Sequence, residues 1–212
     1  MTPLNTADLR GAIAILRLTG HRHIAEAGVA LYEAGLTSME VTFDHPDAPA
    51  ALRELRAALP PDALLGAGTI RTREQVELAA SCGARYCVSP HTDTALIRAV
   101  LSAGLEPLPG ATTATEIAAA QDAGARVIKL FPAGALGLPY LEALLGPFRE
   151  VAFVPTGGIR HDTAGEWIAA GAVAVGLGSD LVPAAPVPDD LPGIARRAAT
   201  VAAQVAAAGK AP

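Results

Sequence analysis

Short runs of apolar and β-branched residues recur along the chain, and their first residues lie about 20 to 26 positions apart. Most runs are continuously hydrophobic rather than alternating, which is typical of parallel strands buried on both faces. We therefore predict a series of buried parallel strands. The runs predicted as strands are Ala12–Leu18, Thr37–Phe43, Ala63–Thr69, Arg85–Ser89, Leu105–Pro109, Arg126–Phe131, Val151–Thr156 and Ala172–Gly176.

Alanine-rich segments lie between these runs, and their ends carry helix signals. Several are followed by glycine, which commonly comes directly after the last helical residue. Thr72 with Gln75 and Thr113 with Glu116 each match a capping box, in which two side chains satisfy free N–H groups at a helix start. The predicted helices include Ile24–Glu33, Ile117–Ala123, Glu166–Ala170 and, after a proline-rich loop at Pro183–Pro192, Ile194–Ala208.

This alternation of strands and helices predicts the fold class. Eight strand–helix units within 212 residues favour an α/β protein with a (β/α)₈ TIM barrel, formed by a single domain over residues 1–212. A doubly wound open sheet is the alternative. The barrel is favoured because the spacing never breaks to mark a second sheet edge.

Composition narrows the classes of function. The formal net charge is −5, which favours neither a nucleic-acid partner nor an anionic membrane surface. No apolar run reaches the roughly 18 residues of a membrane span, and the first residues lack the pattern of a signal peptide. We therefore expect a cytoplasmic protein, with Cys82 and Cys87 as reduced core residues.

Charged, hydroxyl and glycine residues gather at the ends of the predicted strands, where barrels of this type carry their chemistry. Lys129 stands out because it lies inside the apolar run Val127–Phe131. Burial lowers the pKa of a lysine and favours the neutral amine that attack on a ketone requires. A lysine that reaches solvent or pairs with a carboxylate is the alternative interpretation.

Two further charged residues belong to apolar strands. Glu40 is a candidate general base, and a buried ion pair with Lys129 is the alternative. Arg17 lies near the end of the first run, and its planar guanidinium suits a carboxylate or a phosphate. An ion pair with Glu40 or Asp44 would equally explain Arg17.

Glycine turns close the last two predicted strands. Gly157, Gly158 and Gly178 let backbone N–H groups approach an anion, and the Ser179 hydroxyl adds a donor. Phosphate sites of such barrels are commonly built from these two loops. We therefore interpret the turns as a phosphate-binding site, with ordinary tight turns as the alternative.

The histidines are weaker candidates. The segment His21–His23 begins a predicted helix without cysteine or clustered carboxylates nearby, so a solvated cap is favoured over a metal site. His91 and His161 each stand alone in a loop, and only His45 is close enough to Glu40 in sequence to line the mouth. Trp167 is expected to pack in a helix, and no metal or cofactor is predicted.

Together these residues resemble the family of 2-keto-3-deoxy-6-phosphogluconate and 2-keto-3-deoxy-6-phosphogalactonate aldolases, which includes the 4-hydroxy-2-oxoglutarate aldolases. The resemblance extends from about Ala12 to Leu181, and the combination of motifs is specific although each motif alone is not. The matching motifs are Glu40-Val41-Thr42, Gly66-Ala67-Gly68-Thr69, Pro109-Gly110, Lys129-Leu130-Phe131-Pro132 and Pro155-Thr156-Gly157-Gly158-Ile159.

The resemblance implies a class I aldolase that needs no metal or cofactor, is usually a homotrimer, and acts on a phosphorylated 2-keto-3-deoxy sugar acid. It implies that Lys129 forms the Schiff base, that Glu40 moves protons and that Thr69 contacts the pyruvate portion. Pro90, which directly follows the fourth run, is placed with these substrate contacts. The glycine turns with Ser179 would hold the 6-phosphate.

The motifs combine two branches of this family. The gluconate branch often has an arginine four residues after the glutamate, where this chain has Asp44. Ile13–Arg17 and Gly176–Asp180 resemble the galactonate branch, whereas Pro155–Gly158 resembles the gluconate branch. We therefore assign substrate-carboxylate binding to Arg17 and leave the epimer preference open.

In the expected reaction, neutral Lys129 attacks the C2 ketone to form an iminium, and Glu40 removes the C4 hydroxyl proton directly or through a water molecule. The C3–C4 bond then breaks to give pyruvate and glyceraldehyde 3-phosphate. One alternative is a phosphosugar isomerase or epimerase on the same barrel, which would need no covalent lysine. Another is a non-catalytic phosphosugar-binding barrel, which would need no buried ionisable residues.

Overall fold

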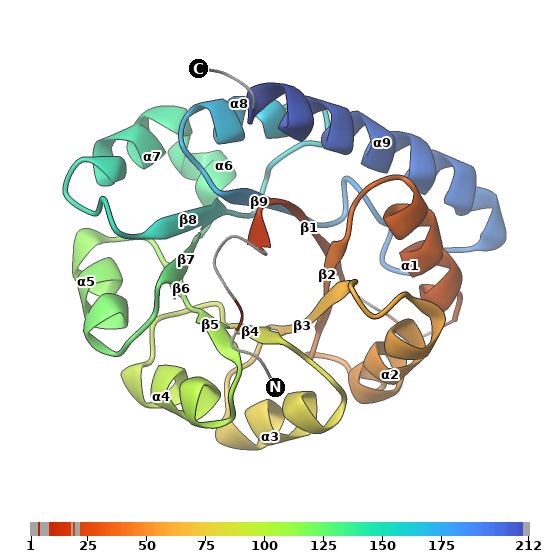
Figure 1. Ribbon diagram of the computed structural model, residues 1–212, viewed down its shortest axis with the longest axis horizontal. Coiled ribbons are helices and arrows are strands. Elements are labelled where there is room, and N and C mark those ends of the chain that lie inside the picture. The colour runs from red at the N-terminus through yellow and green to blue at the C-terminus, as the bar shows by residue number, and fades with distance from the viewer. Residues whose placement is uncertain (1–3, 5–8, 18, 20–21, 210–212) are drawn as a thin grey trace.

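The computed structural model describes residues 4, 9–17, 19 and 22–209. In this part of the chain the strands lie side by side around the centre of the molecule, and the helices lie outside them (Figure 1). All the strand pairs are parallel. The protein is therefore an α/β protein, as the alternation of apolar runs and alanine-rich segments predicts.

The described strands form two sheets, one of six strands in the order β5-β4-β3-β2-β1-β9 and one of three in the order β6-β7-β8. Their register places the Glu40 backbone between Ile15 and Gly66, and the Lys129 backbone between Gly110 and Val154. The strands are β1 (Gly11–Leu16), β2 (Ser38–Thr42), β3 (Leu64–Gly68), β4 (Tyr86–Val88), β5 (Glu106–Leu108), β6 (Gly110–Ala111), β7 (Val127–Leu130), β8 (Ala152–Pro155) and β9 (Ala174–Leu177).

The fifth predicted strand, Leu105–Pro109, is observed as β5, and Pro109 separates it from the short strand β6, which was not predicted. Proline lacks the N–H that a central strand donates to its neighbour. The Pro109 carbonyl still accepts the Lys129 N–H at 2.9 Å, which links the two sheets here. On the other side, an isolated parallel bridge and the hydrogen bond from the Val173 N–H to the Phe153 carbonyl, at 3.0 Å, join β8 to β9.

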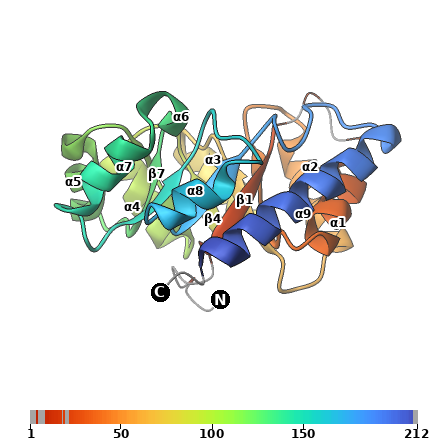
Figure 2. The ribbon, with the colours of Figure 1, turned by 90° about the horizontal axis from the view of Figure 1, so that it is seen from above.

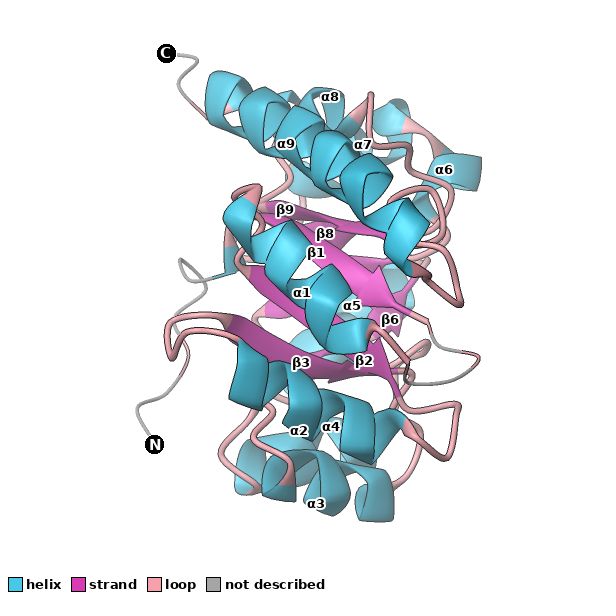
Figure 3. Ribbon diagram, turned by 90° about the vertical axis from the view of Figure 1, so that its right-hand side faces the viewer, coloured by secondary structure: helices cyan, strands magenta, loops and turns pink. Residues whose placement is uncertain are grey.

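The helices pack on the outer faces of the strands, and the last helix, α9, lies alongside α8 and α1 (Figures 1 and 2). Figure 3 shows the strands between helices on opposite sides. The described helices are α1 (Ile24–Glu33), α2 (Ala48–Ala58), α3 (Arg73–Ser81), α4 (Thr94–Ser102), α5 (Ala114–Asp122), α6 (Ala133–Leu136), α7 (Leu138–Leu145), α8 (Ala164–Ala169), the 3₁₀ helix η2 (Pro188–Asp190) and α9 (Leu191–Ala208).

Most local expectations are confirmed. Helix α1 has the predicted bounds, and both capping boxes form at the starts of α3 and α5. The prediction of a loop over Pro183–Pro192 is wrong in its second half. Proline suits the first turn of a helix, and accordingly η2 begins at Pro188 and α9 begins at Leu191. Leu18, the expected end of the first strand, lies outside the described residues.

Apolar side chains form two cores. The larger core lies between the strands and the helices and includes Trp167, Cys82 and Cys87. The smaller core is shared by strands of both sheets, so it lies in the space that they surround; Tyr86 is its largest fully buried side chain. A side chain at Gly66 would come within 2.3 Å of the Tyr86 ring, so this glycine makes room for the tyrosine.

No helix among the described residues has the length and apolar character needed to cross a membrane.

Candidate active site

Lys129 lies in the middle of β7 with only 9% of its surface exposed. Burial lowers the pKa of Lys129; the Glu40 carboxylate opposes this change and Arg17 adds to it. The Lys129 Nζ atom lies 5.1 Å from the centre of the Phe131 ring, a contact that favours the charged form. Burial has the largest effect on the pKa, so Lys129 gives up its proton more readily than an exposed lysine.

Glu40 lies on β2 and is 3% exposed. Burial raises the pKa of Glu40, and the positive charges of Lys129 and Arg17 oppose this rise. Gly68 on the neighbouring strand leaves space for the carboxylate, because a side chain there would come within 2.4 Å of the Glu40 Oε1 atom. A carboxyl group with a raised pKa in a closed site suits proton transfer in both directions.

Lys129 lines two hollow spaces. The larger is an open cavity of about 340 Å³ at the ends of β1, β7, β8 and β9, and Glu40 does not line it. The smaller is an inner void of about 10 Å³, and both Glu40 and Lys129 line it. Among the ion pairs of the described residues, none joins Lys129 to Glu40. The two groups therefore face a shared space rather than satisfying each other directly.

Thr156 and Gly176 form a wall common to both spaces. They face each other across the isolated bridge between the two sheets. A side chain at Gly176 would come within 2.4 Å of the Thr156 Oγ1 atom. The threonine therefore occupies the volume that the glycine leaves empty.

The predicted phosphate-binding residues come together on the larger cavity, which is lined by Gly157, Gly158, Gly178 and Ser179. Gly157 and Gly158 have φ angles of 86° and 76°, a region that side-chain-bearing residues rarely adopt. A side chain at Gly157 would also come within 2.7 Å of the Phe131 ring, whereas Gly178 faces open space. We call these four residues the anion seat.

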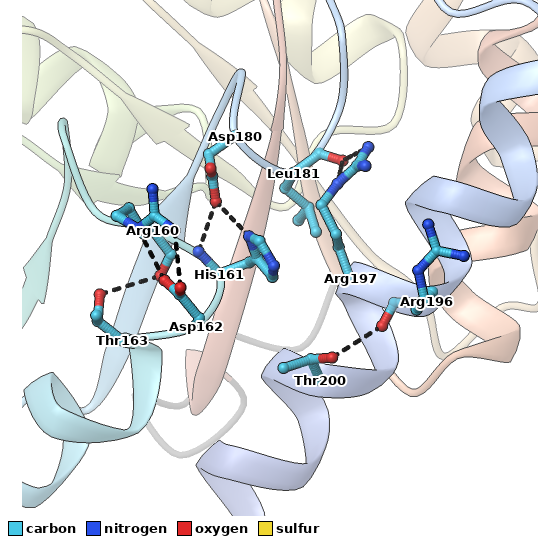
Figure 4. Close-up of polar contacts among 9 residues, drawn as sticks. All are labelled: Arg160, His161, Asp162, Thr163, Asp180, Leu181, Arg196, Arg197 and Thr200. Atoms are coloured by element: carbon cyan, nitrogen blue, oxygen red, sulfur yellow. Dashed lines mark hydrogen bonds and ion pairs between the residues drawn. The ribbon is translucent and has the colours of Figure 1, made fainter.

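Two charged residues at the anion seat were not predicted from the sequence. Arg160 and Asp180 line the same cavity, directly after the Gly157-Gly158-Ile159 turn and after Ser179. The Arg160 guanidinium donates two hydrogen bonds to the Asp162 carboxylate, at 2.9 and 2.7 Å (Figure 4). Their positions directly beside the predicted turns were the available signal.

The interpretation of His161 as standing alone is wrong. Its backbone N–H donates to the Asp180 Oδ2 atom at 2.6 Å, and its ring Nδ1 lies 2.7 Å from the same oxygen (Figure 4). The two residues are 19 positions apart, and parallel strands β8 and β9 bring the loops that follow them together. Sequence position alone gives no sign of this contact.

Of the remaining residues predicted to contact the substrate, Arg17 lines the cavity and the others do not. Arg17 lines the cavity and forms an ion pair with Asp44, one of the two partners considered from the sequence. Thr69 and Pro90 are not among the residues that line it. Thr69 has a φ angle of 57°, an uncommon and strained conformation for a β-branched residue. His45 lines neither space, and its Nδ1 accepts a hydrogen bond from the Asp47 N–H.

Within the described ranges, no group of three or more histidine, cysteine or acidic side chains is arranged to hold a metal ion. His23 contacts Glu26 through Nδ1 at 3.2 Å, as a solvated helix start would, while His21 lies outside the described residues. Cys82 and Cys87 are buried and free, as expected for reduced core residues.

Comparison with known proteins decides the family. The family of KDPG and KHG aldolases, which are the 2-keto-3-deoxy-6-phosphogluconate and 4-hydroxy-2-oxoglutarate aldolases, matches residues 5–195. The chain belongs to this aldolase family. It is 36% identical to the 2-dehydro-3-deoxy-6-phosphogalactonate aldolase of Escherichia coli (strain K12), over 80% of this chain and 83% of that protein. It is 40% identical to the 2-dehydro-3-deoxy-phosphogluconate aldolase of Treponema pallidum (strain Nichols), over 73% of this chain and 74% of that protein.

Solved structures of the aldolase family share the fold. A structure described as native KDPGal aligns with a TM-score of 0.87 and 33% identity, over 94% of this chain and 96% of that one. A KDPG aldolase from Legionella pneumophila, with pyruvate captured at low pH as a covalent carbinolamine intermediate, aligns with a TM-score of 0.79 and 28% identity over 95% of each chain. Membership of this aldolase family favours a lyase over the isomerase and the non-catalytic alternatives.

Proposed function

We propose that the protein is a class I aldolase that cleaves a phosphorylated 2-keto-3-deoxy sugar acid through a Schiff base on Lys129. The observation that carries this proposal is the position of Lys129, which is buried, has a lowered pKa and lines both the open cavity and the void that Glu40 also lines. The covalent pyruvate intermediate of the Legionella relative supports the same chemistry.

The reaction begins when the neutral Lys129 amine adds to the C2 ketone to form a carbinolamine, which loses water to give an iminium. Glu40 removes the proton of the C4 hydroxyl, the C3–C4 bond breaks, and its electron pair moves into the iminium. Glyceraldehyde 3-phosphate leaves. The resulting enamine takes a proton at C3, and water hydrolyses the new iminium to release pyruvate and free Lys129.

A water molecule between Glu40 and the substrate fits this geometry better than direct contact. Glu40 does not line the open cavity, and the void it shares with Lys129 has a volume of about 10 Å³. This is close to the space that one buried water molecule requires. We propose that such a water carries the C4 proton to Glu40 and later returns a proton to the enamine.

The substrate would extend from the interior to the anion seat. We propose that Arg17 binds the substrate carboxylate, since a guanidinium has five N–H donors and Asp44 occupies only part of them. Thr69 and Pro90, which follow β3 and β4 and do not line the open cavity, are proposed to contact the pyruvate portion. At the other end, Gly157, Gly158, Gly178 and Ser179 would bind the phosphate, with Arg160 as an additional cation.

The chain offers a clean test because it contains only two lysines, Lys129 and Lys210. Incubation with pyruvate and borohydride, followed by peptide mass spectrometry, should place a reduced carboxyethyl adduct on Lys129. Lys210→Arg is the matched control and should label as fully as the unchanged protein. Lys129→Arg should lose both the adduct and the cleavage activity. Labelling that persists in Lys129→Arg, or the absence of any adduct, would overturn the proposal.

Three broader features belong to the same proposal. We propose that the two sheets form one closed (β/α)₈ barrel within a single domain, supported by the hydrogen bond from Lys129 on β7 to Pro109, the residue after β5, and by the contacts that join β8 to β9. We also propose that the enzyme is a homotrimer. Its two free buried cysteines suit a reducing compartment such as the cytoplasm.

Turnover of the two epimeric phosphorylated keto acids and of 4-hydroxy-2-oxoglutarate, measured side by side, would decide the preferred substrate. Relatives of both the gluconate and the galactonate type match this chain.

A further inference from the structure

The anion seat is divided between two separate loops. Gly157 and Gly158 follow β8, whereas Gly178 and Ser179 follow β9. Among their described residues, the two strands share an isolated bridge and the Val173–Phe153 hydrogen bond, and they belong to different sheets. A site that binds an anion with both loops needs a further contact that fixes the distance between them.

His161 and Asp180 supply this contact. Two groups of His161, the backbone N–H and the ring Nδ1, meet the same Asp180 oxygen at 2.6 and 2.7 Å. The side chains are about one quarter and one third exposed, so solvent only partly competes with the bonds. Burial alone would raise the pKa of Asp180, but the hydrogen bonds and charge of His161, together with the charge of Arg160, outweigh this and lower it.

The loop that follows β9 is also fixed by a contact with α9. Arg197 on α9 donates two hydrogen bonds to the Leu181 carbonyl, at 3.1 and 2.9 Å. Figure 4 shows His161 reaching Asp180 from one side while Arg197 reaches Leu181 from the other. The segment that carries Ser179 is therefore fixed at two successive residues, and His161 is its link to the first loop.

The charge of Asp180 makes the link to His161 important for an anionic ligand. Asp180 lines the cavity beside Ser179, and a free carboxylate there would repel a phosphate group. The His161 N–H groups engage its Oδ2 atom and reduce the negative charge that it presents to the cavity. The same contact thus sets the spacing of the two loops and offsets the only acidic side chain among the cavity-lining residues that the structure describes.

We propose that His161 and Asp180 are positioning residues that clamp the two halves of the anion seat together for a phosphate-bearing substrate. This inference rests on the phosphate assignment of the proposed function. It goes beyond that assignment because neither residue needs to touch the reacting carbons. The clamp acts on the phosphate end alone.

The direct test is calorimetric titration of the whole protein with inorganic phosphate. His161→Ala should weaken phosphate binding about tenfold, because it removes a hydrogen bond to a charged group. His161→Asn should restore most of the affinity, since its amide can donate near the position of Nδ1. His91→Ala, which changes an exposed histidine in another loop, should bind like the unchanged protein. Equal affinity in His161→Ala, or no phosphate binding in the unchanged protein, would overturn the clamp.

Kinetics provide a readout that general damage to the fold would not imitate. In His161→Ala, KM for the phosphorylated keto acid should rise about tenfold with little change in kcat. KM for 4-hydroxy-2-oxoglutarate, which carries no phosphate, should remain unchanged. An equal loss on both substrates would contradict the clamp. If the unchanged protein binds phosphate but forms no pyruvate adduct, the aldolase proposal fails, and the phosphate titration still decides the clamp.

Discussion

At the scale of single residues, the charge of Glu40 affects the pH at which the Lys129 amine becomes neutral and reactive. The Glu40 carboxylate raises the pKa of Lys129, opposing the larger effect of burial. Glu40→Gln removes this negative charge, so the pKa of Lys129 should fall further. Neutral amine is present above the pKa. The pH at which pyruvate trapping reaches half its maximum should therefore shift downward.

The same variant should cleave the substrate more slowly, although its lysine is trapped by pyruvate at a lower pH. Glu40→Gln removes the proton acceptor, and loss of a general base typically costs about 10²–10⁴-fold in rate. Trapping profiles with pyruvate and steady-state cleavage rates, measured over the same pH range, test both effects. A trapping profile that moves upward or stays in place would show that Glu40 does not act on the Lys129 charge.

The sequence was sufficient to find these two residues because each is a charge within an apolar run. The same reasoning did not reveal Arg160 or the contact between His161 and Asp180. Their side chains lie in loops, where polar residues are ordinary and hydrophobic patterning gives no information. Their importance depends on which loops meet in space, and only the strand order determines that.

At the scale of elements, the start of α5 is connected to the site by hydrogen bonds. Glu116 accepts from the Thr112 and Thr113 N–H groups, at 2.9 and 2.7 Å. The Thr112 hydroxyl donates in turn to the Phe131 carbonyl at 2.6 Å, two residues beyond Lys129. A capping box that is recognisable from sequence therefore also supports the segment after β7.

We expect Glu116→Gln to lower the free energy of unfolding by about 1 kcal/mol at neutral pH, because the bonds to a charged carboxylate become bonds to a neutral amide. Hydrogen bonds from the Thr113 and Thr112 backbones lower the pKa of Glu116. Its contribution is therefore present above the pKa of an unfolded glutamate and is lost as the pH falls through the lowered folded value. The difference in the free energy of unfolding between the unchanged protein and Glu116→Gln should disappear over the same pH interval.

Urea unfolding at neutral and acidic pH measures this difference. Glu142→Gln, at an exposed position on α7, is the matched control and should stay within about 0.5 kcal/mol of the unchanged protein. A difference for Glu116→Gln that persists at acidic pH would argue against a charged cap.

The elements themselves were largely predictable, since α1 and both capping boxes follow local patterns. The short strand β6 beyond Pro109 was not, because the pairing of Gly110 and Ala111 with β7 is set by which strands are neighbours in space. The early start of α9 was missed for a related reason. A proline-rich segment suggests a loop, although proline is also well suited to the first turn of a helix.

At the scale of the whole molecule, the proposed homotrimer has a direct physical consequence. Sedimentation equilibrium should give three times the 21.4 kDa mass of the chain. Partly exposed leucines on two neighbouring helices, Leu78 on α3 and Leu101 on α4, are apolar surface that assembly could cover. A mass equal to one chain across the micromolar range would contradict the trimer while leaving the chemistry of Lys129 unaffected.

The contact between Thr156 and Gly176 limits how sequences of this family can diverge. A methyl group added at position 176 would overlap the threonine, so a larger residue there requires a smaller one at position 156. The two positions border both the open cavity and the inner void, so neither can change without altering the space beside Lys129. Evolution of this enzyme should therefore replace them as a pair, and their substitutions should be correlated among its relatives.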